Sequence, residues 1–178
     1  MDYDLILKRN RKSPILDVAA NELIKLNYTQ EAIKRILPHR DPLLLLDKLS
    51  AIDLTKGQET IIAERYIDPI DPIFKGHFPN HPVYPGCLQV EMAGQAGLAL
   101  SHFMLGKTTE IDLKAIPSPV RATKVLGALF LEPIVPDQTV TILTKCLEFD
   151  GYLGKFLGQV MAQGKVTSVS IMEVFFLT

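Results

Sequence analysis

The residues best suited to chemistry lie between Gly76 and Gly97, where a proline-rich loop joins an apolar helix. His77 opens the loop, and Glu91 falls in the second turn of a helix expected over residues 86–105. An imidazole with an unperturbed pKa near ~6.5 can act as a neutral base at cellular pH. A carboxylate in an apolar helix is costly unless it is hydrogen-bonded or functional, and apolar surroundings are expected to raise its pKa. The pair is therefore a candidate base and acid.

The expected helix is apolar almost all the way round, so other parts of the protein must surround it. Strands are expected to form that wall, because the rest of the chain is rich in short apolar runs separated by turn residues. The expected strands span residues 43–54, 58–67, 121–131, 139–149, 155–163 and 167–176. This order predicts an α+β fold, with an antiparallel sheet of about six strands wrapped around one long central helix.

The N-terminal part is expected to be a short helical extension over residues 1–30 that packs on a domain formed by residues 31–178. Ser13-Pro14 predicts the start of a helix that runs to about Asn27, and Thr29 predicts the cap of a second short helix. The basic residues among the first twelve are read as a frayed, solvated end or, alternatively, as a docking patch for an acidic partner.

The bulk composition excludes several classes of protein. With 178 residues, 47% of them hydrophobic, the chain can form one globular domain, and its net charge of −1 gives no general attraction to nucleic acid. Two cysteines do not make a disulfide framework, and the sequence shows no secretory signal, so we expect a cytoplasmic protein. The helix over 86–105 is long enough to span a bilayer, but Glu91 and His102 within it indicate a buried core helix and no membrane span.

Each candidate residue also has an alternative interpretation. A lone loop histidine often bonds only to backbone, and Glu91 is alternatively a buried acid satisfied near the start of its helix. His81 lies four residues after His77, but the surrounding prolines exclude a helical pair of ligands, so no metal site is expected. Cys87 is alternatively a nucleophile activated by the helix start, or more simply a small buried cysteine. His39 is read as a structural residue.

Five segments occur in an order typical of one known family. They are LPHRDPLLLLD (37–47), GHFPNHPVYPGCLQVEMAGQ (76–95), Ala128-Leu129-Phe130, PIVPD (133–137) and KFLG (155–158). Together they resemble the FabZ-type (3R)-hydroxyacyl-[acyl-carrier-protein] dehydratases over roughly residues 30–178. The resemblance implies the hot-dog fold and dehydration of a 3-hydroxyacyl thioester to the trans-2-enoyl thioester, with no metal or organic cofactor.

The resemblance also implies roles for individual residues. His77 would be the catalytic histidine and Glu91 the catalytic acid, with His77 of one subunit facing Glu91 of the other in a homodimer or a trimer of dimers. The backbone N–H of Gly86 would polarise the thioester carbonyl, and Gln95 would lie beside Glu91. The other substrate-binding residues implied are Phe78 and Pro85.

The implied partner is an acyl carrier protein that presents the acyl group on phosphopantetheine. The LFLEP segment over 129–133 replaces a family stretch rich in arginine and lysine. An acidic carrier protein usually binds to basic surface, so this chain is expected to bind its carrier through other basic residues. Asn80 replaces a common glycine, and a glycine often found just before Asp137 is missing. The basic residues expected to replace the lost stretch are Lys34, Arg35, Lys48, Lys75 and the cluster over 8–12.

These departures favour a specialised polyketide or lipid pathway over housekeeping fatty-acid elongation. Three rival functions stay open at this point. They are an acyl thioesterase on the same fold, a non-catalytic relative that binds acyl carriers, and a dehydratase with an added isomerase activity.

Overall fold

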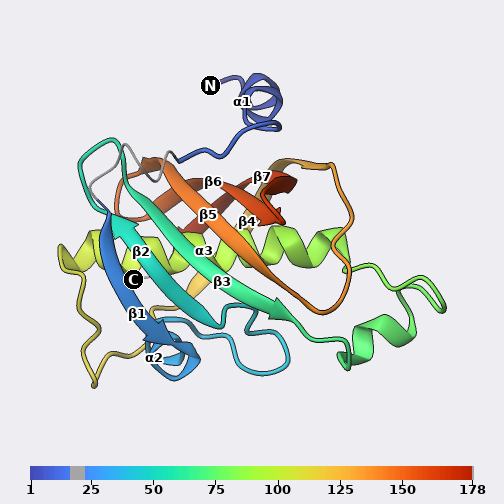
Figure 1. Ribbon diagram of the computed structural model, residues 1–178. Coiled ribbons are helices and arrows are strands. Elements are labelled where there is room, and N and C mark those ends of the chain that lie inside the picture. The colour runs from blue at the N-terminus through green and yellow to red at the C-terminus, as the bar shows by residue number, and fades with distance from the viewer. Residues whose placement is uncertain (17–22, 178) are drawn as a thin grey trace.

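The computed structural model describes residues 1–16 and 23–177, which contain one antiparallel sheet in the order β1-β2-β3-β5-β6-β7-β4. The strands are β1 (Ile24–Thr29), β2 (Lys48–Asp53), β3 (Thr60–Ile67), β4 (Val120–Phe130), β5 (Gln138–Phe149), β6 (Leu153–Ala162) and β7 (Lys165–Phe176). The helices are α1 (Tyr3–Arg9), α2 (Gln30–Ile36) and α3 (Gly86–Gly106), with a 3-10 turn η1 (Pro72–Lys75). Figure 1 shows α3 crossing behind the curved strands, with α1 at the top.

The long apolar helix forms as the sequence predicts. Most of α3 is buried, and it packs mainly on β5 and β6, so the sheet supplies the apolar surroundings that the helix needs. Small residues allow this close packing: a Cβ atom added at Gly97 would lie 2.8 Å from the Phe156 ring. Among the described helices, none is long and apolar enough to cross a membrane.

Of the four C-terminal strands, β5, β6 and β7 form consecutive antiparallel hairpins, whereas β4 pairs with β7 and not with the next strand in the sequence, β5. Gly151 and Gly164 turn the chain between β5, β6 and β7 with positive φ angles of 95° and 76°. In the first of these turns, the Asp150 carboxylate accepts hydrogen bonds from the backbone N–H groups of Tyr152 and Leu153.

The first expected strand is shorter than the apolar run indicated. β2 begins only at Lys48, and the leucines at 44–46 are buried in a loop rather than a strand. In this loop, backbone groups of Leu43 and Leu45 bond to the side chain of Gln95 on α3 instead of to a neighbouring strand. A buried loop and a buried strand both appear in the sequence as a continuous apolar run, so the run of leucines did not distinguish between them.

The sheet has one strand more than the sequence predicted. The prediction of a helix up to Asn27 was wrong, since the end of that segment is a strand. Ile24–Thr29 form β1, which pairs with β2, and residues 13–16 are not helical. Alternating Leu26 and Tyr28 face the core, a period of two rather than of a helix. The rest of the expected helix, residues 17–22, lies outside the described residues. The second short helix is confirmed as α2, although Thr29 makes no side-chain cap bond.

Residues 3–9 form α1, so the expectation of a frayed end is wrong there. Asp2 caps α1 by accepting a 3.0 Å hydrogen bond from the Leu5 N–H. Leu7 is buried in a second apolar cluster, with side chains of β6 and β7 and with Leu126 and Leu129 of β4 packed against it. The division into an extension over 1–30 and a domain over 31–178 stays a prediction, and β1 lies within the common sheet.

Candidate active site

His77 is held by the loop that leads into α3. Its Nδ1 atom lies 2.7 Å from the carbonyl oxygen of Val83, and its ring stacks on Phe78 with 4.1 Å between centroids. A carbonyl can only accept, so the Nδ1 atom carries the hydrogen. The Nε2 atom of a neutral His77 therefore keeps its lone pair, which is the form that a general base requires.

The N-terminus of α3 and His77 line the same cavity. A cavity of about 690 Å³ is lined by both His77 and the segment Pro85–Cys87, with Phe130 of β4 on another side. Pro85 offers no side-chain cap, and the first N–H groups of a helix have no intrahelical acceptor. Donors and positive helix potential therefore face a cavity in which a thioester carbonyl could bind. Glycine at position 86 lets the Phe130 ring lie against the start of the helix, because an added Cβ atom there would lie 2.7 Å from that ring.

Glu91 lies on α3 between the polar side chains of Gln95 and His39. The Nε2 atom of Gln95 donates to Glu91 Oε1 at 2.8 Å, and the Nε2 atom of His39 lies 3.3 Å from the same oxygen. The carboxylate is half-buried in a cavity of about 170 Å³, with apolar walls from α3, β4 and β7. This carboxyl group is partly desolvated and has a fixed orientation.

The pKa of Glu91 is lowered, which corrects the expectation that its apolar surroundings would raise it. The hydrogen bond from His39 is the largest cause, and the bond from Gln95 acts in the same direction. Burial raises the pKa, but these two donors outweigh it because they stabilise the charged carboxylate. A glutamate with two nearby donors thus behaves differently from one in a purely apolar pocket.

Gln95 is itself fixed by the loop before β2. Its Oε1 atom accepts from the backbone N–H of Leu45 at 2.8 Å, and its Nε2 atom also donates to the carbonyl of Leu43 at 2.7 Å. Gln95 is buried, so these bonds satisfy both ends of its amide. The loop that carries His39 is thereby tied to the helix that carries Glu91.

A single chain does not bring His77 and Glu91 into one cavity. Gly86, Pro85 and His77 share the larger cavity, whereas Glu91 and Gln95 line the smaller one together with His39. Phe78 is exposed beside His77 and does not line either cavity. β4 is the common boundary: its end, Phe130, borders the first cavity, and its beginning borders the second.

The structure adds one contact at this site and corrects one interpretation. The sequence interpretation of His39 as structural did not include its contact with Glu91. The available signal was a lone histidine shortly before the run of leucines whose backbone bonds to Gln95. Cys87 was expected to be a small buried cysteine, yet it is exposed.

Two of the family departures have a backbone explanation. Asn80 has a φ of 64° and Asp137 a φ of 63°, the left-handed conformation that favours glycine. Asparagine and aspartate tolerate this conformation better than most residues. Among residues 1–16 and 23–177, no group of three or more His, Cys, Asp or Glu side chains is placed to hold a metal ion.

A long central helix wrapped by one antiparallel sheet, with polar groups at its first turns, defines a hot-dog fold. The dehydratase heterocomplex ApeI:P from Xenorhabdus doucetiae has a similar fold, with a TM-score of 0.57 and 18% identity over 82% of this chain and 91% of that one. The FabA-like domain family matches residues 37–174.

Relatives with higher sequence identity identify the family. The 3-hydroxyacyl-[acyl-carrier-protein] dehydratase FabZ of Pseudoalteromonas translucida is 34% identical over 154 residues, which are 86% of this chain and 95% of that protein. The FabZ protein of Campylobacter jejuni strain 81-176 is 32% identical over 82% of this chain and 94% of its own length. The chain belongs to the FabZ-type family of hot-dog dehydratases.

Proposed function

We propose that the protein dehydrates a (3R)-3-hydroxyacyl thioester on acyl carrier protein to the trans-2-enoyl thioester. The observation that carries this function is the combination of a free imidazole nitrogen on His77, an uncapped helix start at Gly86 and an oriented carboxyl group on Glu91. β-Elimination next to a thioester needs these three elements: a base for C2, donors for the carbonyl oxygen and an acid for the C3 hydroxyl.

The reaction follows from these roles. His77 Nε2 removes the C2 proton while the N–H of Gly86 stabilises the negative charge that develops on the thioester oxygen. The electron pair of the broken C–H bond forms the C2–C3 double bond as the C3–O bond breaks. Because the pKa of Glu91 is lowered, its protonated form is the minor one at neutral pH, and this form gives a proton to the departing hydroxyl, directly or through a water molecule, as water leaves. The proton on His77 then returns to Glu91 through the released water or solvent.

The exposed edge of β4 supports a site shared between two subunits. β4 has 11 residues, ends the sheet and exposes apolar side chains such as Val125 and Phe130. A long apolar edge strand is unusual in a monomer, because its free N–H and C=O groups can pair with a second copy.

Antiparallel pairing of two β4 edges about a two-fold axis would set the end of one strand beside the beginning of the other. Phe130, which borders the His77 cavity, would then approach Val120 and Ala122, which border the Glu91 cavity of the second copy. Homodimer formation would thus join the two halves of the site. Assembly into a trimer of dimers stays a prediction.

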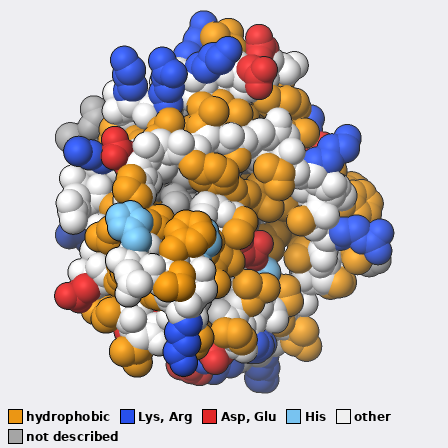
Figure 2. All heavy atoms as spheres, turned by 90° about the vertical axis from the view of Figure 1, so that its right-hand side faces the viewer, with side chains coloured by type: hydrophobic (Ala, Val, Ile, Leu, Met, Phe, Trp, Pro, Cys, Tyr) orange, Lys and Arg blue, Asp and Glu red, His pale blue; other side chains and the backbone are white. Residues whose placement is uncertain are grey.

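Basic surface near the site supports the proposed contact with a carrier protein. Lys34 and Arg35 are already engaged, by Glu31 and by the carbonyl of Leu113. The cluster at Lys8, Arg9, Arg11 and Lys12 is exposed, and no ion pair links it to another described residue. Figure 2 shows Lys and Arg side chains gathered at the top of one face, above a broad apolar area.

The basic cluster has a fixed position. Buried Gln159 of β6 donates from Nε2 to the carbonyl oxygens of Asn10 and Ser13 and accepts from the N–H of Ile15 at 2.8 Å. The cluster is therefore a docking surface for an acidic carrier protein by charge complementarity. A cytoplasmic location and a specialised polyketide or lipid pathway remain predictions from the sequence.

Incubation with a 3-hydroxyacyl thioester on carrier protein tests the function. Formation of the enoyl thioester, followed by its ultraviolet absorbance, is the expected result, whereas release of a free thiol would indicate a thioesterase. His77→Ala and Glu91→Gln should each lower kcat by about 10²- to 10⁴-fold while the protein stays folded. Full activity in either variant would contradict the proposed site.

A further inference from the structure

The hydrogen bonds around Glu91 distinguish its two carboxyl oxygens. Gln95 Nε2 and His39 Nε2 both approach Oε1, at 2.8 Å and 3.3 Å. Within the described part of the chain, no hydrogen bond or ion pair reaches Oε2. The Glu91 side chain keeps 30% of its surface exposed, and Oε2 is the oxygen without a protein partner among the described residues.

The surroundings of His39 assign its hydrogen. The Nδ1 atom of His39 is buried and has no hydrogen-bond partner within the described residues. A neutral imidazole has a single N–H, and a buried N–H without an acceptor is costly. The hydrogen therefore belongs on Nε2, which lies 3.3 Å from Glu91 Oε1.

Two donors on one oxygen determine where a carboxyl proton can lie. Oε1 already accepts from Gln95 and His39, so the proton of a protonated Glu91 must be on Oε2. When Oε2 gives up that proton, the two N–H groups stabilise the carboxylate that forms.

We propose that His39 is a positioning residue for dehydration: with Gln95 it occupies Oε1 of Glu91, so that Oε2 carries the proton to the C3 hydroxyl. This inference rests on the proposed function and adds a residue to it. In the step itself, the Oε2–H bond breaks, an O–H bond to the departing hydroxyl forms, and His39 keeps its own proton throughout.

The cavity around Glu91 is lined by few titratable groups. Its walls come from the loop at Pro38-His39, from α3, from β4 and from β7, and His39 and Glu91 are the titratable residues among those that line it. The neighbouring Arg40 is exposed and donates to the carbonyls of Leu37 and His39. A change in the titration of Glu91 after substitution of His39 can therefore be attributed to that contact.

Three variants test the role of His39 in the full-length protein. His39→Ala removes the donor, and His39→Gln offers an amide N–H that does not titrate. His102→Gln is the matched control, because His102 is a half-buried histidine further along α3 that contacts neither Glu91 nor His77. For each, kcat and KM are measured from pH 5 to 9 with a 3-hydroxyacyl thioester, and the Glu91 carboxyl is titrated by ¹³C NMR.

The expected result is specific to positioning. His39→Ala should lower kcat by about 10- to 100-fold with little change in KM, and should move the Glu91 titration to higher pH. His39→Gln should recover part of both effects, and His102→Gln should match the wild type.

Two outcomes must be kept apart. If His39→Ala is folded and leaves both kcat and the Glu91 titration unchanged, the inference is wrong, even when Glu91→Gln is inactive. If Glu91→Gln is itself fully active, the proposed function of the site fails first. Should His39→Ala not fold, His39→Gln decides: wild-type kcat together with a titration at higher pH would overturn the proposal.

Discussion

The side chain of Gln95 donates from Nε2 to Oε1 of Glu91 at 2.8 Å, one turn earlier on the same helix. The same amide bonds to the backbone of Leu43 and Leu45. One buried glutamine thus supports the loop that carries His39 and orients the carboxyl group. Under the proposed role of Glu91, Gln95 therefore links the stability of the fold to catalysis.

Substitution of Gln95 should affect both properties. Gln95→Leu leaves the backbone N–H of Leu45 and the C=O of Leu43 without their partner, which is expected to cost about 1–3 kcal/mol in the free energy of unfolding. Urea unfolding measures this loss, and kcat should fall as well. Gln89→Leu is the control on the same helix, where the described bond is a single one from Thr167, so its stability loss should be smaller. Equal losses would argue against a special role for Gln95.

The close contact between Gly86 and Phe130 predicts a second effect. Gly86→Ala places a methyl group 2.7 Å from the Phe130 ring, so the first turn of α3 or the end of β4 must shift. A displacement of about 1 Å at the N–H that we propose to bind the thioester carbonyl should lower kcat by about 10²-fold. The double variant Gly86→Ala/Phe130→Ala removes the clash and should recover part of the activity. No recovery would show that the glycine is needed for another reason.

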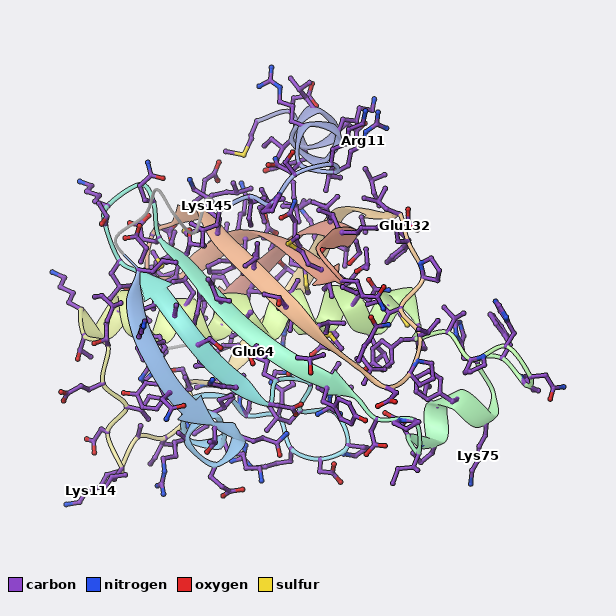
Figure 3. All side chains as sticks on the ribbon, in the orientation of Figure 1. Arg11, Glu64, Lys75, Lys114, Glu132 and Lys145 are labelled. Carbon is purple, nitrogen blue, oxygen red and sulfur yellow. The ribbon has the colours of Figure 1, made fainter. Side chains whose placement is uncertain are left out.

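Charge reversal of the basic cluster tests carrier docking. Glutamate at positions 8, 9, 11 and 12 should raise KM for carrier-bound substrate by about tenfold or more at low salt, because the complementary charge is lost. The rate with a pantetheine or coenzyme A thioester should not change. Figure 3 shows Arg11 at the top of the molecule and Lys114 at the lower left, far from it in this view, so Lys114→Glu is the control. An unchanged KM for the carrier-bound substrate would remove the cluster from the docking surface.

The lowered pKa of Glu91 predicts a pH dependence of stability. In the folded protein, the bonds from His39 and Gln95 hold the pKa of this carboxyl below its ordinary value of 4.5. Their stabilisation is therefore complete above about pH 4.5 to 5 and is lost as pH falls through the folded pKa. Glu91→Gln lacks this contribution, so its unfolding free energy should fall less than that of the wild type between pH 5 and 3. Parallel curves from chemical unfolding would contradict the assigned direction.

The sequence predicted the parts of the fold that have regular patterns. α3 is apolar on all sides, and β5, β6 and β7 are separated by glycine turns, so their positions follow from local rules. α1 was missed because Leu7 is buried by long-range contacts with β6 and β7. β1 was missed because Leu23, Ile24 and Leu26 also fit a helical stripe.

At the candidate site, too, contacts between distant segments could not be predicted from the sequence. The segment around His77 and Glu91 could be recognised in the sequence, but the contact from His39 depends on the turn of a distant loop. The direction of the Glu91 pKa depends on that contact, so it could not be derived from the apolar helix alone.

A mixed dimer tests the central claim most directly. The His77→Ala and Glu91→Gln chains, carrying different tags, are co-expressed, and the heterodimer is purified through both tags. If His77 of one subunit works with Glu91 of the other, one of the two sites keeps both residues, and the heterodimer should show about half of the wild-type kcat. Each homodimer should stay inactive. A heterodimer as inactive as its parents would contradict a site built from two subunits.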